Sequence, residues 1–236
     1  MSNAWPEQIT GISSMATRAV LAELTEAYTQ RGGVAVRIES VGGVDAARRV
    51  QAGEAFDVVV LASEAIDRLI AGGSVMAASK VDLVHSGVAV AVRAGAPLPD
   101  LGSEDAVREA VLAARSIGIS TGPSGVQLEQ LFARWGLQPQ IRERMVQAPP
   151  GVPVGGLVAR GEVELGFQQL SELIHLEGIS VAGPLPAAIQ ITTTFSAAVC
   201  AGSMRLHAVR ELFAFLVSPA ADAAKRRHGM VPATRL

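Results

Sequence analysis

The chain has 236 residues, of which 49% are hydrophobic and 18% charged, a composition that excludes a disordered chain. Its 20 basic and 22 acidic residues give a net charge of −2, which argues against a nucleic-acid-binding protein because such proteins carry a basic excess. A single cysteine, Cys200, excludes an internal disulfide and a multi-cysteine metal site. We therefore expect neither a metal nor a cofactor.

Strands and helices alternate along the sequence, which predicts an α/β fold with mostly parallel sheets. The first helix shows the pattern clearly, because Val20, Leu21 and Leu24 recur at helical spacing and Gly32 ends the run. We expect Asp45 to cap the second helix. In chain order the sequence predicts strands over 8–11, 34–40, 56–61, 81–93, 116–120, 163–167 and 187–200, and helices over 16–31, 46–52, 63–71, 126–135, 207–217 and 219–227.

Two long extended segments, 81–93 and 187–200, bracket the middle of the chain. This arrangement predicts two α/β lobes joined by two crossing strands, with a ligand cleft between the lobes. Lobe 1 would comprise residues 5–84 and 196–236, and lobe 2, residues 85–195, would be inserted into it. We expect the protein to be a monomer.

Clusters of Gly, Ser and Thr occur where a predicted strand meets the following helix. Ligands of open α/β sheets bind at the carboxyl ends of the strands, and helix N-termini there offer free N–H groups to an anion. Ordinary helix capping explains any single cluster, but their recurrence in both halves favours an anion site. The candidate residues from these loops are Ser13, Ser14, Gly42, Gly43, Val44, Ser63, Thr121, Ser124, Gly125 and Val152.

Arg18 follows Ser14 by four residues, in the first turn of the first predicted helix. A cation is disfavoured there by the helix dipole, so we expect an anionic partner for it. That partner is either a ligand carboxylate or an acidic side chain, and the sequence leaves both open.

Five segments carry a resemblance to a known family. The segments SSMATRAVLAELTEAYTQRGG, VGGVDAARRVQAGEAFDVVVLAS, GISTGPSGVQLEQLFARWGL, VGGLVARGEVELGFQQLSEL and LFAFLVSPAADAAKRRHGM resemble molybdate-type periplasmic solute-binding proteins. The resemblance implies the type II periplasmic-binding fold, whose two lobes close on a small anion. It also implies an ABC transporter membrane subunit as partner and a periplasmic protein whose export signal has been removed.

Carried over by position, the family's anion loops fall on Ser13-Ser14, Gly42–Val44, Ser124-Gly125 and Val152. A further contact, often a tyrosine in the family, falls on Gln169, which Gln168 precedes. The second loop reads Val-Gly-Gly-Val and supplies no hydroxyl, whereas the oxyanion-binding members have serines there. A buried oxyanion needs donors for its oxygens, so these departures favour an organic di- or tricarboxylate.

Two alternatives to this organic-anion-binding protein remain. One is a protein that binds molybdate, tungstate or a similar oxyanion. The other is an exported enzyme of the aconitate isomerase type, since some proteins that resemble the family are such enzymes. An isomerase needs an acid or base beside the ligand and donors for an enolate-like intermediate. Glu64 and His85 are the candidates for that acid or base.

Overall fold

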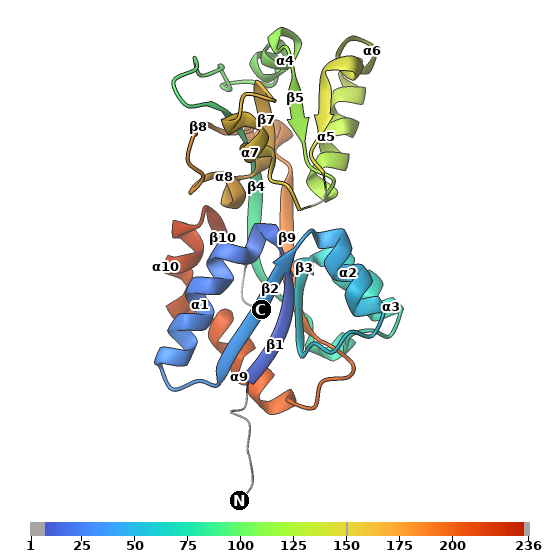
Figure 1. Ribbon diagram of the computed structural model, residues 1–236, viewed down its shortest axis with the longest axis vertical. Helices are drawn as coiled ribbons and strands as arrows, with labels where there is room; N and C mark the ends of the chain where they lie inside the picture. The colour runs from blue at the N-terminus through green and yellow to red at the C-terminus, as the bar shows by residue number, and fades with distance from the viewer. Residues whose placement is uncertain (1–7, 150, 234–236) are drawn as a thin grey trace, which may run out of the picture. The chain divides into compact units, whose positions relative to one another are not determined.

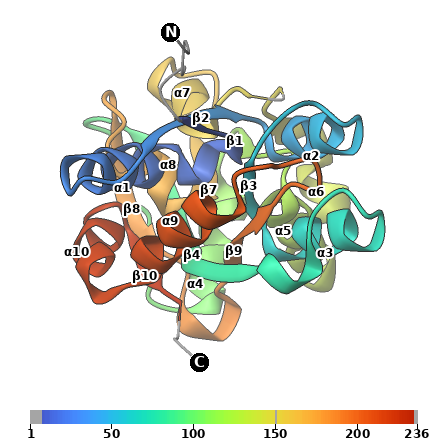
Figure 2. The same ribbon diagram turned by 90° about the horizontal axis from the view of Figure 1, so that it is seen from below.

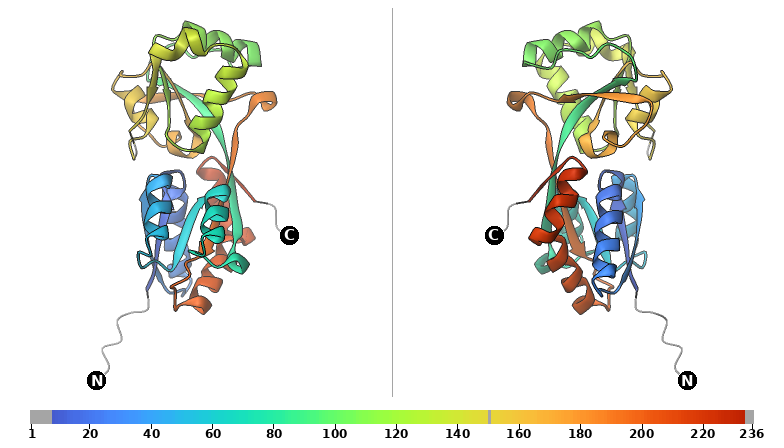
Figure 3. Two further views of the ribbon diagram at one scale, coloured as in Figure 1. Left: turned by 90° about the vertical axis from the view of Figure 1, so that its right-hand side faces the viewer. Right: turned by 90° about the vertical axis from the view of Figure 1, so that its left-hand side faces the viewer.

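The computed structural model describes residues 8–149 and 151–233, which divide into two α/β units. Unit 1 comprises the chain up to His85 together with Thr194 onwards, and unit 2 is Ser86–Thr193. Strands β4 (Val81–Arg93) and β9 (Thr192–Val199) carry the chain from one unit to the other (Figures 1 and 3). The lobe limits expected from the sequence stay a prediction, and their residues 5–7 lie outside the described part.

Unit 1 is built on a sheet with the strand order β2-β1-β3-β9. Strand β1 runs parallel to β2 and to β3, and β9 runs antiparallel to β3. Besides β9, the strands of unit 1 are β1 (Gln8–Ser14), β2 (Ala35–Val41), β3 (Val58–Ala62) and β10 (Met230–Pro232). Its helices are α1 (Arg18–Gln30), α2 (Gly43–Gln51), α3 (Ser63–Ala71), α9 (Leu206–Leu216) and α10 (Pro219–Arg227).

Helices cover both faces of this sheet (Figure 2). Val58 and Val60 of β3 pack into the cluster formed with α1, α9 and α10, whereas Val59 and Leu61 pack with α2 and α3. Successive strand side chains point to opposite faces, so a strand covered on both faces must be apolar at every position. This requirement explains the unbroken apolar run of β3.

Unit 2 has the strand order β4-β7-β5-β6, in which β5 runs parallel to β6 and β7. Strand β4 pairs antiparallel with β7 and β8. Val88 and Val90 of β4 face one core cluster, and Ala89 and Ala91 face another. The other elements are β5 (Ile117–Ile119), β6 (Met145–Gln147), β7 (Leu165–Gln169), β8 (Ile179–Pro184), α4 (Glu104–Ala113), α5 (Pro123–Arg134), α6 (Gln138–Ile141), α7 (Val154–Ala159) and α8 (Leu170–Leu173).

The alternation of strands and helices is confirmed, but two helix starts were predicted wrongly. Helix α2 begins at Gly43 after the cap residue Gly42, and Asp45 lies in its first turn and forms an ion pair with Arg48. Helix α5 begins at Pro123, since proline suits the first helical position, so Ser124 and Gly125 lie inside its first turn. Among the described helices, none combines the length and apolarity needed to cross a membrane.

Candidate functional site

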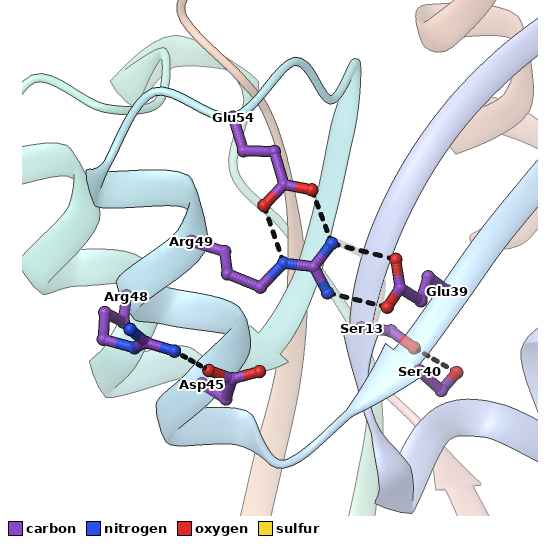
Figure 4. A network of polar contacts seen from close by, with 7 residues as sticks. All are labelled: Ser13, Glu39, Ser40, Asp45, Arg48, Arg49 and Glu54. Atoms are coloured by element: carbon purple, nitrogen blue, oxygen red, sulfur yellow. Dashed lines mark hydrogen bonds and ion pairs between the residues drawn. The ribbon is translucent and has the colours of Figure 1, made fainter.

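The carboxyl ends of β1 and β2 bring serines together in unit 1. Ser13 and Ser40 are register partners, and their Oγ atoms lie 2.8 Å apart (Figure 4). Ser40 was not a sequence candidate, because only the strand register shows that it adjoins Ser13. It supplies a hydroxyl immediately before the Val-Gly-Gly-Val loop, so the loop's own lack of serines is partly offset.

Ser14 is the most distinctive residue of this edge. It is 7% exposed, and its Oγ is buried without a hydrogen-bond partner in the described chain. Its carbonyl oxygen is satisfied, because the hydroxyls of Ser13 and Thr17 donate to it at 3.3 Å and 3.1 Å. Buried polar atoms are normally paired, so an unpaired one at a strand end suggests a place where a ligand donates or accepts.

The first turn of α2 lies beside Ser14. A Cβ atom at Gly43 would stand 3.6 Å from the Ser14 Cβ, an ordinary contact distance. The free N–H groups at the start of α2 therefore adjoin the unpaired hydroxyl. Val44, the next residue, is 69% exposed.

Arg18 is the first residue of α1, two residues after the helix start expected from the sequence, and its side chain is exposed. It lines a cavity of about 450 Å³ together with Thr25 and Ser40. Within the described part of the chain Arg18 forms no ion pair with an acidic side chain. A ligand carboxylate as its partner stays a prediction.

Arg49 ties β2 to α2. Its guanidinium donates to Glu39 at 2.7 Å and 3.0 Å and to Glu54 at 2.7 Å, and these hydrogen bonds hold the pKa of both carboxyls below the usual range (Figure 4). Glu39 directly precedes Ser40. The two-sided bridge therefore ties the end of β2 to the last turn of α2 and to the segment that follows this helix.

The remaining candidates of unit 1 lie on α3 and β4. Ser63 begins α3 and is half-buried, and Glu64 is exposed in the first turn of the same helix. His85 is half-buried on β4, and its Nδ1 lies 2.9 Å from the Thr194 Oγ1. The catalytic roles of Glu64 and His85 stay predictions.

In unit 2 the loop after β5 is shaped by Gly125. A Cβ atom there would lie 1.9 Å from the carbonyl oxygen of Ser120, so a larger residue cannot fit without moving the backbone. The tight loop brings the Oγ atoms of Ser120 and Ser124 to 3.4 Å. Thr121 in the same loop is half-buried, and so is Val152, whose N–H donates to the Pro149 carbonyl at 3.0 Å.

Gln168 and Gln169, the last residues of β7, are both buried but differ in their partners. Gln168 accepts from the Gly155 N–H at 3.0 Å and donates to Glu172 at 2.8 Å, so its amide is engaged at both ends. Gln169 donates to the Thr193 hydroxyl at 2.8 Å, and its Oε1 has no hydrogen-bond partner in the described chain. Gln169 therefore resembles Ser14 in holding a polar atom free.

Glu172 on α8 was not found from the sequence. Burial raises the pKa of its carboxyl to about 7, against a smaller lowering by the Gln168 hydrogen bond. Its position in the run Leu-Ser-Glu-Leu gives no sign of burial, because a glutamate three residues after a strand end is usually a solvated helix residue. No three His, Cys, Asp or Glu side chains lie together as metal ligands within the described residues.

The fold agrees with the comparisons with known proteins. The family model of bacterial extracellular solute-binding proteins matches residues 9–231, and the chain belongs to this family. The fold is that of the type II periplasmic binding proteins, as the resemblance implied. The periplasmic molybdate-binding protein of Azotobacter vinelandii matches with a TM-score of 0.79 at 21% identity, covering 96% of this chain and 100% of that one.

Two further relatives are informative. The sulfate-binding protein SubI of Mycobacterium tuberculosis matches with a TM-score of 0.77 at 20% identity, covering 96% of this chain and 87% of that one. An aconitate isomerase from a Pseudomonas species is 38% identical over 232 residues, which cover 95% of this chain and 87% of the relative. These two solved structures show the shared fold at 20–21% identity, whereas the isomerase is 38% identical.

Substitution of Gly125 tests the loop after β5. We expect Gly125→Ala to lower the free energy of unfolding by about 1–3 kcal/mol, because the methyl group must displace the Ser120 carbonyl. Gly122→Ala is the matched control: its Cβ would meet only the Ser120 Oγ at 3.7 Å, so we expect a change within about 0.5 kcal/mol. Urea unfolding of the two variants measures the difference; equal effects would contradict the assigned crowding.

Glu172 predicts a pH dependence of stability. The folded chain keeps a proton on this carboxyl up to pH about 7, whereas the unfolded chain loses it near the ordinary glutamate pKa of 4.5. Raising the pH through this window therefore costs about 3 kcal/mol of folding free energy in all. We expect Glu172→Gln to gain stability over the wild type between pH 5 and 8, as read from urea unfolding. Glu177→Gln, an exposed control, should show no such gain, and an equal gain there would refute the assignment.

Proposed function

We propose that this protein binds an unsaturated tricarboxylate of the aconitate type and interconverts its cis and trans isomers. The observation that carries the proposal is the 38% identity to an aconitate isomerase over 95% of the chain. The molybdate- and sulfate-binding proteins share the fold at only 20–21% identity, which is weaker evidence for a shared ligand.

The donors of unit 1 suit carboxylates. Arg18 can bind a carboxylate in a bidentate manner, and the Ser14 hydroxyl can donate one hydrogen bond to it. The glycines of the Val-Gly-Gly-Val loop leave room for a ligand larger than a tetrahedral oxyanion to approach the backbone. This donor set supports the expected organic anion better than molybdate.

Gln169 can serve an anion in unit 2 by turning its side-chain amide. The Thr193 hydroxyl both donates and accepts, so it is satisfied by either end of the amide that it contacts. With the amide reversed, Oε1 accepts from Thr193 and the Nε2 hydrogens become free for a carboxylate. Amide orientation follows from the hydrogen-bond network, and an anionic ligand would select the donating one.

Isomerisation requires, besides a site that binds the anion, a group that removes a proton from the substrate and returns it. Cis and trans isomers interconvert only if the carbon–carbon double bond is broken for a time. A base that removes a proton from the methylene carbon of the substrate delocalises the electrons over the allylic carbons and the adjoining carboxylates. Return of a proton to the other allylic carbon yields the isomer, and carboxylate-binding donors stabilise the enolate-like intermediate.

Capture of a solute for ABC-type uptake is the second candidate function. Membership of the extracellular solute-binding family favours it, and it implies a transporter membrane subunit as partner and a periplasmic location. The ligand would again be an organic di- or tricarboxylate, or an oxyanion as in the structural relatives. Tight binding without turnover separates this function from the isomerase.

A binding and turnover assay tests the proposal. We expect trans-aconitate and cis-aconitate to raise the melting temperature, by the equivalent of about 4 kcal/mol at a thousand times the dissociation constant, and molybdate and sulfate not to. We further expect the proton NMR spectrum of either isomer to change into the same equilibrium mixture. Heat-inactivated protein is the control for spontaneous conversion. Binding of aconitate without conversion would support uptake instead, and stabilisation by molybdate alone would contradict both tricarboxylate functions.

A further inference from the structure

We propose that Glu172 is the catalytic base that carries the proton in this isomerisation, in place of Glu64 or His85. The inference rests on the proposed function and adds the residue that performs its central step. Three features of unit 2 support it: the position of α8, the hydrogen bond to Gln168, and the absence of charge around the carboxyl.

Helix α8 begins at the residue after Gln169, so Glu172 lies at the carboxyl end of β7. Strand β7 runs parallel to β5, whose carboxyl end leads into the loop of Ser120 and Ser124. The carboxyl ends of parallel strands meet at one edge of a sheet, and Figure 1 shows α8 and the start of α5 at the same end of unit 2. Glu172 thus shares its edge with the anion-binding candidates of this unit.

Gln168 holds the carboxyl of Glu172 in place. Its Nε2 donates to Oε1 of Glu172 at 2.8 Å, and its Oε1 is fixed in turn by the Gly155 N–H at 3.0 Å. In the described chain Glu172 receives this one side-chain hydrogen bond, which leaves Oε2 able to meet a proton of the substrate. The side chain is largely but not wholly buried, as a base in contact with a ligand must be.

The surroundings of Glu172 are uncharged. Strands β7 and β8 and helix α7, which pack against α8, carry no titratable side chain. Strand β4 also contacts α8, through Ser86 and Ser171, and carries Asp82, His85 and, at its exposed end, Arg93. His175 and Glu177 follow α8. With no cation to lower it, the pKa of Glu172 rises on burial to about 7, where a carboxylate is a stronger base than in water and still exchanges protons at neutral pH.

The proposed step balances without a co-reactant. The Glu172 carboxylate takes a proton from the methylene carbon, and the electrons of that carbon–hydrogen bond form the allylic, enolate-like anion. The resulting carboxylic acid returns the proton to the other allylic carbon, which restores the carboxylate and places the double bond between the former methylene carbon and its neighbour. The new double bond has the opposite geometry when the intermediate has been held in the other conformation.

Glu172→Gln tests the assignment, because it keeps the size of the side chain and removes the base. We expect turnover of trans-aconitate to fall at least about 100-fold, whereas its affinity by thermal shift stays within about 3-fold. Glu172→Asp should restore part of the turnover. The wild-type kcat/KM should fall as the pH decreases below about 7, since the base must be unprotonated. The exposed control Glu177→Gln should keep turnover within about 3-fold of the wild type.

The failures of the two proposals are distinguishable. Wild-type protein that binds aconitate without converting it would overturn the proposed function, and this inference with it. Wild-type turnover that survives in Glu172→Gln would overturn the role of Glu172 alone, and its loss in Glu64→Gln or His85→Ala would move the base to that residue. Should Glu172→Gln not fold, Glu172→Asp and the wild-type pH profile decide: full turnover of the aspartate variant with no acidic fall near pH 7 would contradict the inference.

Discussion

Polar atoms buried in a protein need hydrogen-bond partners, and the candidate site depends on this constraint. The chain meets it closely elsewhere: Asp57, at 8% exposure, accepts from the Thr10 N–H at 2.9 Å and from the Ser203 hydroxyl at 2.7 Å. At the carboxyl ends of β1 and β7 this requirement is not met. Ser14 Oγ and Gln169 Oε1 are buried without partners in the described residues, one in each unit and each on the last residue of a strand. Such atoms cost folding free energy unless binding satisfies them.

The scaffold keeps these atoms in place through contacts of ordinary strength. Parallel strands align Ser13 with Ser40, and the Arg49 bridge from Glu39 to Glu54 ties the end of β2 to the last turn of α2 and the segment after it. Glycine does the same in unit 2, where Gly125 lets the Ser120 carbonyl approach the start of α5. The polar groups proposed to contact a ligand are therefore carried by elements that pack on apolar cores.

Much of the fold could be predicted from the sequence, because hydrophobic periodicity and glycine positions mark strands and helices directly. The limits of α3, β4 and α10 agree with prediction at both ends. Helix starts were less certain, since Pro123 and Gly43 read equally well as loop residues. The family resemblance predicted the type II periplasmic-binding fold, which local patterns alone could not give.

The candidate site could likewise be predicted only in part from the sequence. The strand-end loops could be predicted, because their residues adjoin in sequence. The Ser13–Ser40 pair depends on strand register, and the buried state of Glu172 depends on the packing of α8, and neither is a local property. The functions assigned to the individual candidates, from Ser14 to Gln169, remain predictions until a ligand is bound.

Ser14→Ala tests directly whether the unpaired Ser14 hydroxyl serves ligand binding. Stability and affinity are measured on the same variant protein. Because the hydroxyl has no partner in the described chain, its removal should not lower the free energy of unfolding of the ligand-free protein. Affinity for trans-aconitate should fall about 5- to 100-fold, the loss of one hydrogen bond to a charged group. Ser74→Ala, outside the strand-end cluster, should leave affinity unchanged. A Ser14→Ala protein that is destabilised but binds aconitate as the wild type does would show that the hydroxyl serves the fold, and would contradict the account.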